Sequence, residues 1–347
     1  MPKDTRDVII SPDGALNFIS FTTLLTPDDQ FLGQKYALRY VASSRDLLRQ
    51  TESSKTNKMT VYANPAYAGK GIIASIPTSS GSITLRSMKM RDLQAIQLKP
   101  LPGTEKECDL LEIQARKWKW PVTVFEKQKA TEVQLYATRS SRILHLATHG
   151  FFLPESDIEG LRGKGDRRGI GGVSSFSDIS LNGKSGSVMN KQVILKNPMH
   201  RSGFALAGAQ DTFDAWKRGN VPDTANDGIV TAEEVGGLKL GDTQLVVLSA
   251  CDTGVGESRS GEGIMGLRRG FIQAGAKHLM MTLWPVTDKI TPEIMVDFYQ
   301  EFQKSNHAPQ ALVDVQRKWL VKLREERGLH AAVTIAGPFI MSSQGNQ

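Results

Sequence analysis

The chain has little cysteine: Cys108 and Cys251 are the only two among 347 residues. Two cysteines exclude a disulfide framework of the kind that stabilises small secreted domains. The composition therefore favours a reducing, cytoplasmic compartment, where any chemistry at Cys251 would be that of a free thiol.

Long hydrophobic runs are also missing. No stretch approaches the roughly 20 apolar residues that a membrane-spanning helix needs, and the opening MPKDTRDVIISPDG has no apolar signal-peptide core. We therefore expect a soluble, cytoplasmic protein with no membrane partner.

A concentrated basic patch is missing too, although the formal net charge is +7. The basic residues are scattered except in RGKGDRR (162–168) and GLRRG (266–270), and neither run contains interleaved aromatic residues. This pattern is typical of solvated surface charge, so we expect nucleic acid as a partner only indirectly, if at all.

A metal-ligand cluster is the last notable absence. His145 precedes His149 by four residues, a spacing that separates two side chains on a strand too widely for one metal ion. We expect no metal and no cofactor, and we interpret His145 as a packing residue.

What is present is an alternation of apolar, strand-like runs with amphipathic, helix-like segments. The runs are almost wholly apolar, which is typical of a parallel sheet covered by helices on both faces. This pattern predicts an α/β fold. The expected strands are 58–65, 121–125, 142–150, 244–251, 278–286 and 331–339, and the expected helices are 101–118, 130–140, 261–276, 288–304 and 308–326.

Two regions depart from this alternation. Residues 1–58 read as short strands and turns, with a hairpin expected at VIISPDGALNFISF, and we interpret them as a β-rich segment that packs on a core formed by residues 59–347. Residues 155–228 are rich in glycine, serine and charge around one apolar island at 201–209. We interpret them as a long, partly mobile insertion.

Chemically useful residues stand at the ends of two predicted strands. RILHLATHG ends in His149 and Gly150, and QLVVLSAC ends in Cys251. Ligands collect at the carboxyl ends of strands in open α/β sheets. If the two strands are neighbours, an imidazole base would face a thiol, and the glycines that follow would leave backbone N–H groups free for an oxyanion.

Two familiar loop motifs fit this stretch poorly. A phosphatase loop needs an arginine six residues after its cysteine, where this chain has Glu257. GEGIMG (261–266) matches a dinucleotide-binding pattern, with Asp288 downstream, but it follows its strand only after about ten residues instead of at once. Trp284, just past another strand, can be read equally as core or as the wall of a substrate pocket.

Several motifs together resemble a known family. The segments RILHLATHGFF, RSGFALAGA, DGIVTAEEVGGLKL, QLVVLSACDTGVG, GEGIMGLRRGFIQAGAKHLMMTLWPVTD and the late AGPF follow one another as they do in the CHAT domain, as do ISPDGALNFISFTTLL and LPGTEKECDLL in the N-terminal half. The CHAT domain is a branch of the caspase-like cysteine peptidases, which include separase and the metacaspases.

The resemblance implies a fold and a reaction. The fold would be a caspase-like α/β/α sandwich with a mostly parallel central sheet and an N-terminal β-rich extension. His149 would be the catalytic histidine and Cys251 the nucleophile of an endopeptidase, with the amides of Gly150 and Cys251 as the oxyanion hole. Where separases and metacaspases carry an aspartate that selects a basic P1 residue, this chain has Ser249; Asp252 and Asp288 are the substitute candidates.

The resemblance also indicates which partners to expect. The substrate would be a protein, and the activator a partner protein, an RNA-guided effector or an N-terminal repeat region, in a bacterial defence or signalling system. The rival hypothesis is a catalytically idle caspase-like scaffold that binds proteins through residues 155–228.

Overall fold

The central sheet is made of strands that are buried on both faces. All residues of Ile143–Ala147, Leu245–Leu248 and His278–Thr282 are buried, as continuous apolar runs predict. The computed structural model describes residues 4–49, 54, 56–69, 97–139, 141–152, 199, 202–218, 226–249, 261–284, 286 and 290–345.

The main sheet has eight strands in the order β1-β2-β11-β10-β9-β5-β3-β4. The five strands from β10 to β4 are mutually parallel. In contrast, β11 runs antiparallel to β10, and β2 and β1 run parallel to β11. The strands are β1 (Asp7–Ile10), β2 (Ala37–Tyr40), β3 (Met59–Pro65), β4 (Val122–Lys127), β5 (Ile143–Ala147), β9 (Leu245–Leu248), β10 (His278–Thr282) and β11 (Phe339–Ser343).

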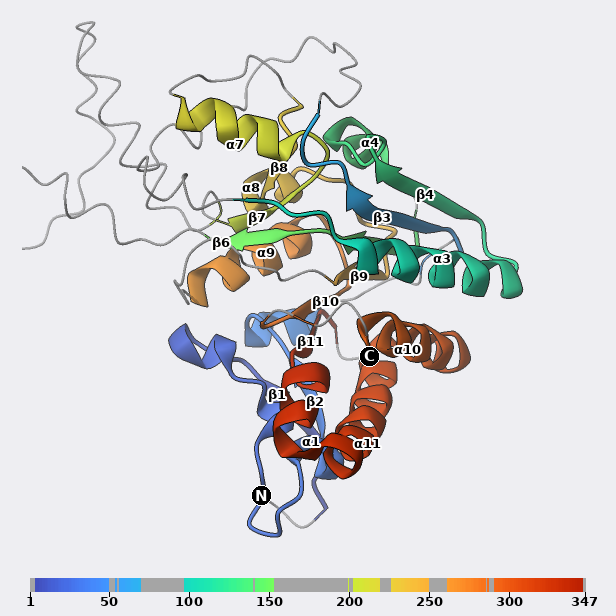
Figure 1. The fold of residues 1–347 in the computed structure, drawn as a ribbon. Helices are drawn as coiled ribbons and strands as arrows, with labels where there is room; N and C mark the ends of the chain where they lie inside the picture. Colours follow the sequence, from blue (N-terminus) through green and yellow to red (C-terminus); the bar gives the residue numbers. More distant parts are fainter. Residues whose placement is uncertain are drawn as a thin grey trace, which may run out of the picture.

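Helices cover both faces of this sheet (Figure 1). One apolar core lies between the sheet and α3 (Pro102–Lys117), α10 (Thr291–Ser305) and α11 (Ala308–Ala336). The other core lies under α4 (Glu132–Ala137), α8 (Ala232–Gly236) and α9 (Gly261–Gln273). The predicted α/β/α sandwich with a mostly parallel sheet is thus confirmed. Among the described helices, none combines the length and the apolar character that crossing a membrane requires.

A second, three-stranded antiparallel sheet continues from the end of β5. It consists of β6 (Gly150–Phe152), β7 (Ser202–Ala205) and β8 (Ile229–Thr231), and α7 (Ala209–Lys217) packs on it (Figure 1). Sequence analysis assigns β7 and α7 to the long insertion, whereas the structure makes β7 a strand of the sheet beside His149 and packs α7 on that sheet. Residues 155–198, 200–201 and 219–225 of the predicted insertion lie outside the described residues.

Two local predictions are wrong. The expected hairpin does not form, because β1 pairs in parallel with β2 and the side chain of Asp13 caps the 3-10 helix η1 (Gly14–Phe18) instead of closing a turn. The strand expected at 331–339 is instead the last part of α11, which continues past a non-helical Gly328 (φ 87°) to Ala336. The final strand is β11, which starts at Phe339, eight residues later than expected.

The remaining N-terminal elements are short. They are the 3-10 helices η2 (Phe21–Thr23) and η3 (Ser44–Leu48) and the helix α1 (Leu32–Lys35). β1 and β2 belong to the same sheet as the rest of the chain, at its edge.

A buried pair of carboxyl groups joins α4 to the start of β8. The Glu132 carboxyl accepts the amide N–H of Gly228 and is hydrogen-bonded to the Asp227 carboxyl. Burial, and then the neighbouring carboxylates of Asp227 and Glu234, raise the pKa of Glu132 well above its usual range. Burial raises the pKa of Asp227 to about 7. At neutral pH the pair therefore retains a proton, which Glu132 donates to Asp227.

We expect this pair to make stability depend on pH. Both folded pKa values lie above those of the unfolded chain, so the folded state binds more protons. Stability therefore falls as the pH rises from about 4, through the folded pKa of about 7 for Asp227, and on toward the raised folded pKa of Glu132. Glu132→Gln supplies a permanent N–H donor to Asp227. It should raise the melting temperature at pH 8 by roughly 2–4 °C, about 1 kcal/mol, relative to its effect at pH 5. Equal shifts at both pH values in calorimetry would contradict a shared proton.

Candidate functional site

The predicted site residues come after the carboxyl ends of three neighbouring parallel strands. The strands β5, β9 and β10 are paired in register, so that Leu248 of β9 is the Cα partner of both Leu146 and Met281. His149, Cys251 and Trp284 each follow their partner by three residues. The condition set by sequence analysis, that the strands before His149 and Cys251 be neighbours, is therefore met.

The structure describes three of the six predicted site residues. His149 and Gly150 follow β5, and Trp284 follows β10, whereas Cys251, Asp252 and Asp288 lie outside the described residues. The indole N–H of Trp284 donates to the carbonyl of Thr334 at 3.2 Å, so the half-buried ring is fixed against α11.

The imidazole of His149 is oriented by a backbone carbonyl. Its Nε2 lies 2.7 Å from the carbonyl oxygen of Lys99, and the residue is 3% exposed. A carbonyl can only accept a hydrogen bond, so Nε2 must carry a proton. In the neutral ring, Nδ1 is then the nitrogen with the basic lone pair.

The main chain of His149 is held by a chain of hydroxyl groups. Its amide N–H donates to the Tyr67 hydroxyl at 3.2 Å, and that hydroxyl lies 2.9 Å from Oγ1 of Thr148. The Thr148 hydroxyl in turn donates to the carbonyl of Ala205. Because the single proton of Thr148 is used there, the Tyr67 hydroxyl must donate to Thr148 and accept from His149. The Tyr67 ring also lies against the imidazole, with 5.0 Å between centroids.

The amide of Gly150 points out of the second sheet. The carbonyl of His149 accepts the N–H of Ala205 at 2.8 Å, so it points toward β7. In a planar trans peptide the N–H lies opposite the C=O, and the described residues contain no cis bond. The N–H of Gly150 is therefore directed away from β7, at the same edge as His149.

His145 belongs to a polar network that sequence analysis missed. It is fully buried, as a packing residue would be, but its Nδ1 lies 2.9 Å from the Tyr299 hydroxyl and its Nε2 lies 3.1 Å from the Glu107 carboxylate. The Ser249 hydroxyl donates to the other oxygen of Glu107 at 3.3 Å. Burial raises the pKa of Tyr299 well above its usual range, so this phenol keeps its proton and donates it to Nδ1.

This network connects the helical layer to the strand that leads to Cys251. Glu107 is on α3 and Tyr299 on α10, while Ser249 stands directly after β9, two residues before Cys251. The members of this network lie far apart in the sequence, so the residue pattern does not show that they meet. The one signal in the sequence is Glu107, a glutamate on the apolar face of the predicted helix 101–118. Lys99 contributes only a main-chain carbonyl, which no residue type can signal.

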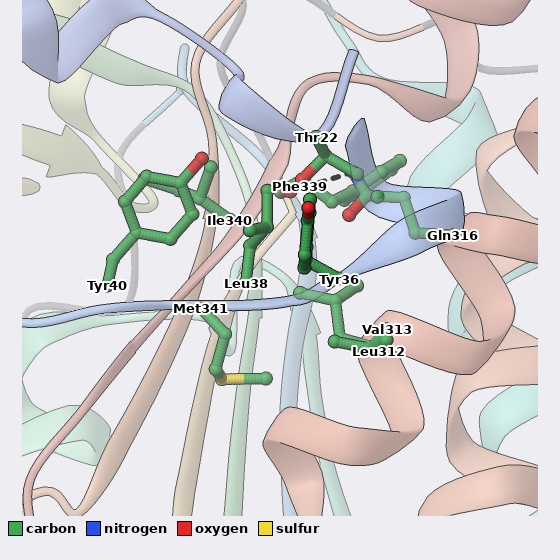
Figure 2. Close-up of a pocket in the computed structure, with 11 residues that line it drawn as sticks. Thr22, Tyr36, Leu38, Tyr40, Leu312, Val313, Gln316, Phe339, Ile340 and Met341 are labelled. Carbon is green, nitrogen blue, oxygen red and sulfur yellow. Dashed lines mark hydrogen bonds between the residues drawn. The ribbon is translucent and has the colours of Figure 1, made fainter. Parts of the chain in front are cut away.

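A small apolar hollow lies elsewhere, between α11, β11 and the N-terminal segment (Figure 2). Leu38, Tyr40 and Ile340 line it, and Gln316 closes one end by donating to the carbonyl of Phe339 at 3.0 Å. It does not include His149. Within the described ranges, no three His, Cys, Asp or Glu side chains are grouped as metal ligands.

The α/β/α sandwich with a mostly parallel central sheet is the fold expected of the caspase-like class. The CHAT domain family model matches residues 1–334, and the chain belongs to that family. A search of curated protein sequences finds no match.

Among solved structures, the chain is similar to one in the Saccharomyces cerevisiae separase–securin complex. The sequence identity is 9% and the TM-score 0.44, over 95% of this chain and 15% of that chain. This chain thus spans less than a fifth of the length of that relative.

We expect Glu107→Gln to destabilise the fold, because a neutral amide replaces the charged acceptor that His145 and Ser249 share. Hydrogen bonds to charged groups contribute roughly 1.5–3 kcal/mol, against about 1 kcal/mol for neutral ones, so the loss should be about 1 kcal/mol. Glu112→Gln is the matched control on the same helix, since its partly exposed pair with Arg116 contributes little. Urea unfolding of the two variants would test this, and equal losses would contradict the network.

Proposed function

We propose that this chain is a cysteine endopeptidase that uses His149 as its base and Cys251 as its nucleophile. The observation that carries the proposal is the register of β5 and β9. It pairs Leu146 with Leu248 and so makes the chain leave both strands at the same level of the sheet. Membership of the CHAT family supports the same reaction.

The His149 geometry supports the role of the base. With its proton on Nε2 and directed at Lys99, the ring presents a basic nitrogen, Nδ1, that can take the thiol proton of Cys251. When the imidazolium forms, the Lys99 carbonyl continues to accept Nε2–H and stabilises the positive charge.

The reaction then follows in two stages, acylation of Cys251 and hydrolysis of the acyl-enzyme. The Cys251 thiolate adds to the scissile carbonyl, and the amides of Gly150 and Cys251 would stabilise the resulting oxyanion. The imidazolium of His149 gives its proton to the leaving amine as the C–N bond breaks, which leaves an acyl-enzyme on Cys251. Water, activated by the same imidazole, hydrolyses the thioester and restores the thiol.

Substrate binding and activation are further parts of the proposal. We propose that Trp284 and the carboxylates of Asp252 and Asp288 contribute to substrate binding. We further propose that a partner protein or an RNA-guided effector activates the peptidase in a bacterial defence or signalling system in the cytoplasm. The Glu107 carboxylate is buried and directed at His145 and Ser249, so it is not free to select a basic substrate residue.

Cleavage of a diverse peptide library, read by mass spectrometry, tests the peptidase. Cys251→Ala and His149→Ala should each lower turnover by about 1,000-fold or more, because nucleophile and base act as one unit. Cys108→Ala is the matched cysteine control and should retain cleavage. Cleavage that persists in Cys251→Ala would contradict the proposal, and a folded wild-type chain that binds proteins without cleaving any peptide would favour the scaffold.

Thiol alkylation provides a second test. Burial, and then the nearby carboxylates of Glu126 and Asp109, raise the pKa of Cys108 far above its usual range. Cys108 should therefore stay protonated and unreactive toward iodoacetamide at neutral pH. Cys251 should be labelled first, with a pH midpoint below the value of about 8.5 for free cysteine. Faster labelling of Cys108 in peptide mapping would contradict this assignment.

A further inference from the structure

Two separate segments hold His149, and one residue of α7 contacts both. Tyr67 holds the main chain of His149, and Lys99 orients its imidazole. Gln210 donates its main-chain N–H to the carbonyl of Tyr67 at 2.8 Å. Its side-chain Oε1 accepts the N–H of Leu98 at 2.7 Å, one residue before the carbonyl that binds the ring.

The Gln210 amide is itself held in one orientation. Its Nε2 donates to the carboxylate of Asp214, one helical turn later, at 2.9 Å. A carboxylate only accepts hydrogen bonds, so it fixes the NH₂ group on its own side and leaves Oε1 facing Leu98. The orientation needed to hold Leu98 is therefore built into α7.

The Gln210 side chain holds the main chain directly before Lys99, and so affects the position of the Lys99 carbonyl. Pro100 follows Lys99 and restricts it to an extended conformation, and α3 begins at Pro102. The position of the carbonyl is thus set by α3 after it and by the Gln210–Leu98 hydrogen bond before it. The Leu98 side chain packs on the apolar cluster beneath α7, with Phe213 and Ala209, and so supports the same geometry.

We propose that Gln210 is a positioning residue that directs the Lys99 carbonyl, and through it the imidazole of His149, toward the reacting thiol. This inference rests on the proposed peptidase. Gln210 touches neither the thiol nor the imidazole; it acts through Leu98 and Lys99. The helix α7 would thus support the catalytic site from outside it.

The consequence is a specific change in the thiol, because the Lys99 carbonyl stabilises the imidazolium that pairs with the thiolate. If the carbonyl is displaced, the ion pair becomes less favourable and the pH midpoint of Cys251 alkylation rises toward that of free cysteine. Misplacement of the base should lower kcat roughly 10- to 100-fold and leave KM within about threefold, because substrate contacts are unchanged.

The test uses the full-length chain with three variants and one control. Gln210→Ala removes the acceptor for Leu98 but keeps the main-chain contact to Tyr67. Gln210→Glu keeps an acceptor but places two carboxylates together. Combining Gln210→Glu with Asp214→Asn restores both hydrogen bonds, since the new amide donates to the new carboxylate. Gln303→Ala, at an exposed position of α10, is the control.

Iodoacetamide labelling of Cys251 is measured against pH, together with kcat, KM and melting temperature. We expect Gln210→Ala and Gln210→Glu to raise the labelling midpoint and to lower kcat. The double variant should recover both values, and the control should change neither. The melting temperature distinguishes this role from a merely structural one, because a structural loss alone would lower it without moving the labelling midpoint.

Two results would overturn the inference. If wild-type Cys251 has a lowered midpoint and Gln210→Ala leaves midpoint and kcat unchanged, the positioning role fails while the peptidase stands. If wild-type Cys251 titrates like free cysteine and no peptide is cleaved, the proposed peptidase fails, and the positioning role with it. A double variant that stays as impaired as Gln210→Glu would also contradict the hydrogen-bond chain.

Discussion

The register of β5, β9 and β10 is the constraint on which the rest of the structure depends. Side chains alternate between two buried cores, so that Ile143 and Ala147 face α3 and α10 while Leu144 and Leu146 face the opposite layer. A slip by one residue would exchange the two sets and bury the wrong side chains on both faces. The apolar cores thereby fix the level at which the chain leaves β5 after Ala147 and β9 after Leu248, without any contribution from the site itself.

The second sheet sets the orientation of the peptide group between His149 and Gly150. Its ladder begins at His149, whose carbonyl accepts the N–H of Ala205, and the same peptide turns the Gly150 amide outward. The glycine directly before β8 is required both by the space around it and by its backbone conformation. Gly228 has φ +79°, and a Cβ there would lie 2.4 Å from the amide nitrogen of Ala209. Gly228, directly before β8, can therefore approach the start of α7 closely.

Sequence patterns predicted the sheet well because the burial of each strand or helix is visible in the residues of that segment alone. Continuous apolar runs mark doubly buried strands, and amphipathic segments mark the helices that cover them. The hairpin at residues 8–21 was wrong because Pro12-Asp13-Gly14 suits a capped 3-10 helix as well as a turn. Strand 331–339 was wrong because buried Ala332 and Ala336 continue a helical face. Lys99, Tyr67 and Glu107 could not be predicted, since each acts through a main-chain atom or a distant partner.

His145 on β5 and His149 just after it show how different surroundings give two histidines different roles. His145 lies between a phenol and a carboxylate, fully buried, so its ring is committed to holding α3, α10 and the end of β9 together. His149 meets a neutral carbonyl instead. A carboxylate at that edge would add a second charge to desolvate, whereas a carbonyl orients the ring without adding a charge. The fold therefore places the buried carboxylate of Glu107 with His145 and a neutral carbonyl with His149, the histidine that we propose as the base.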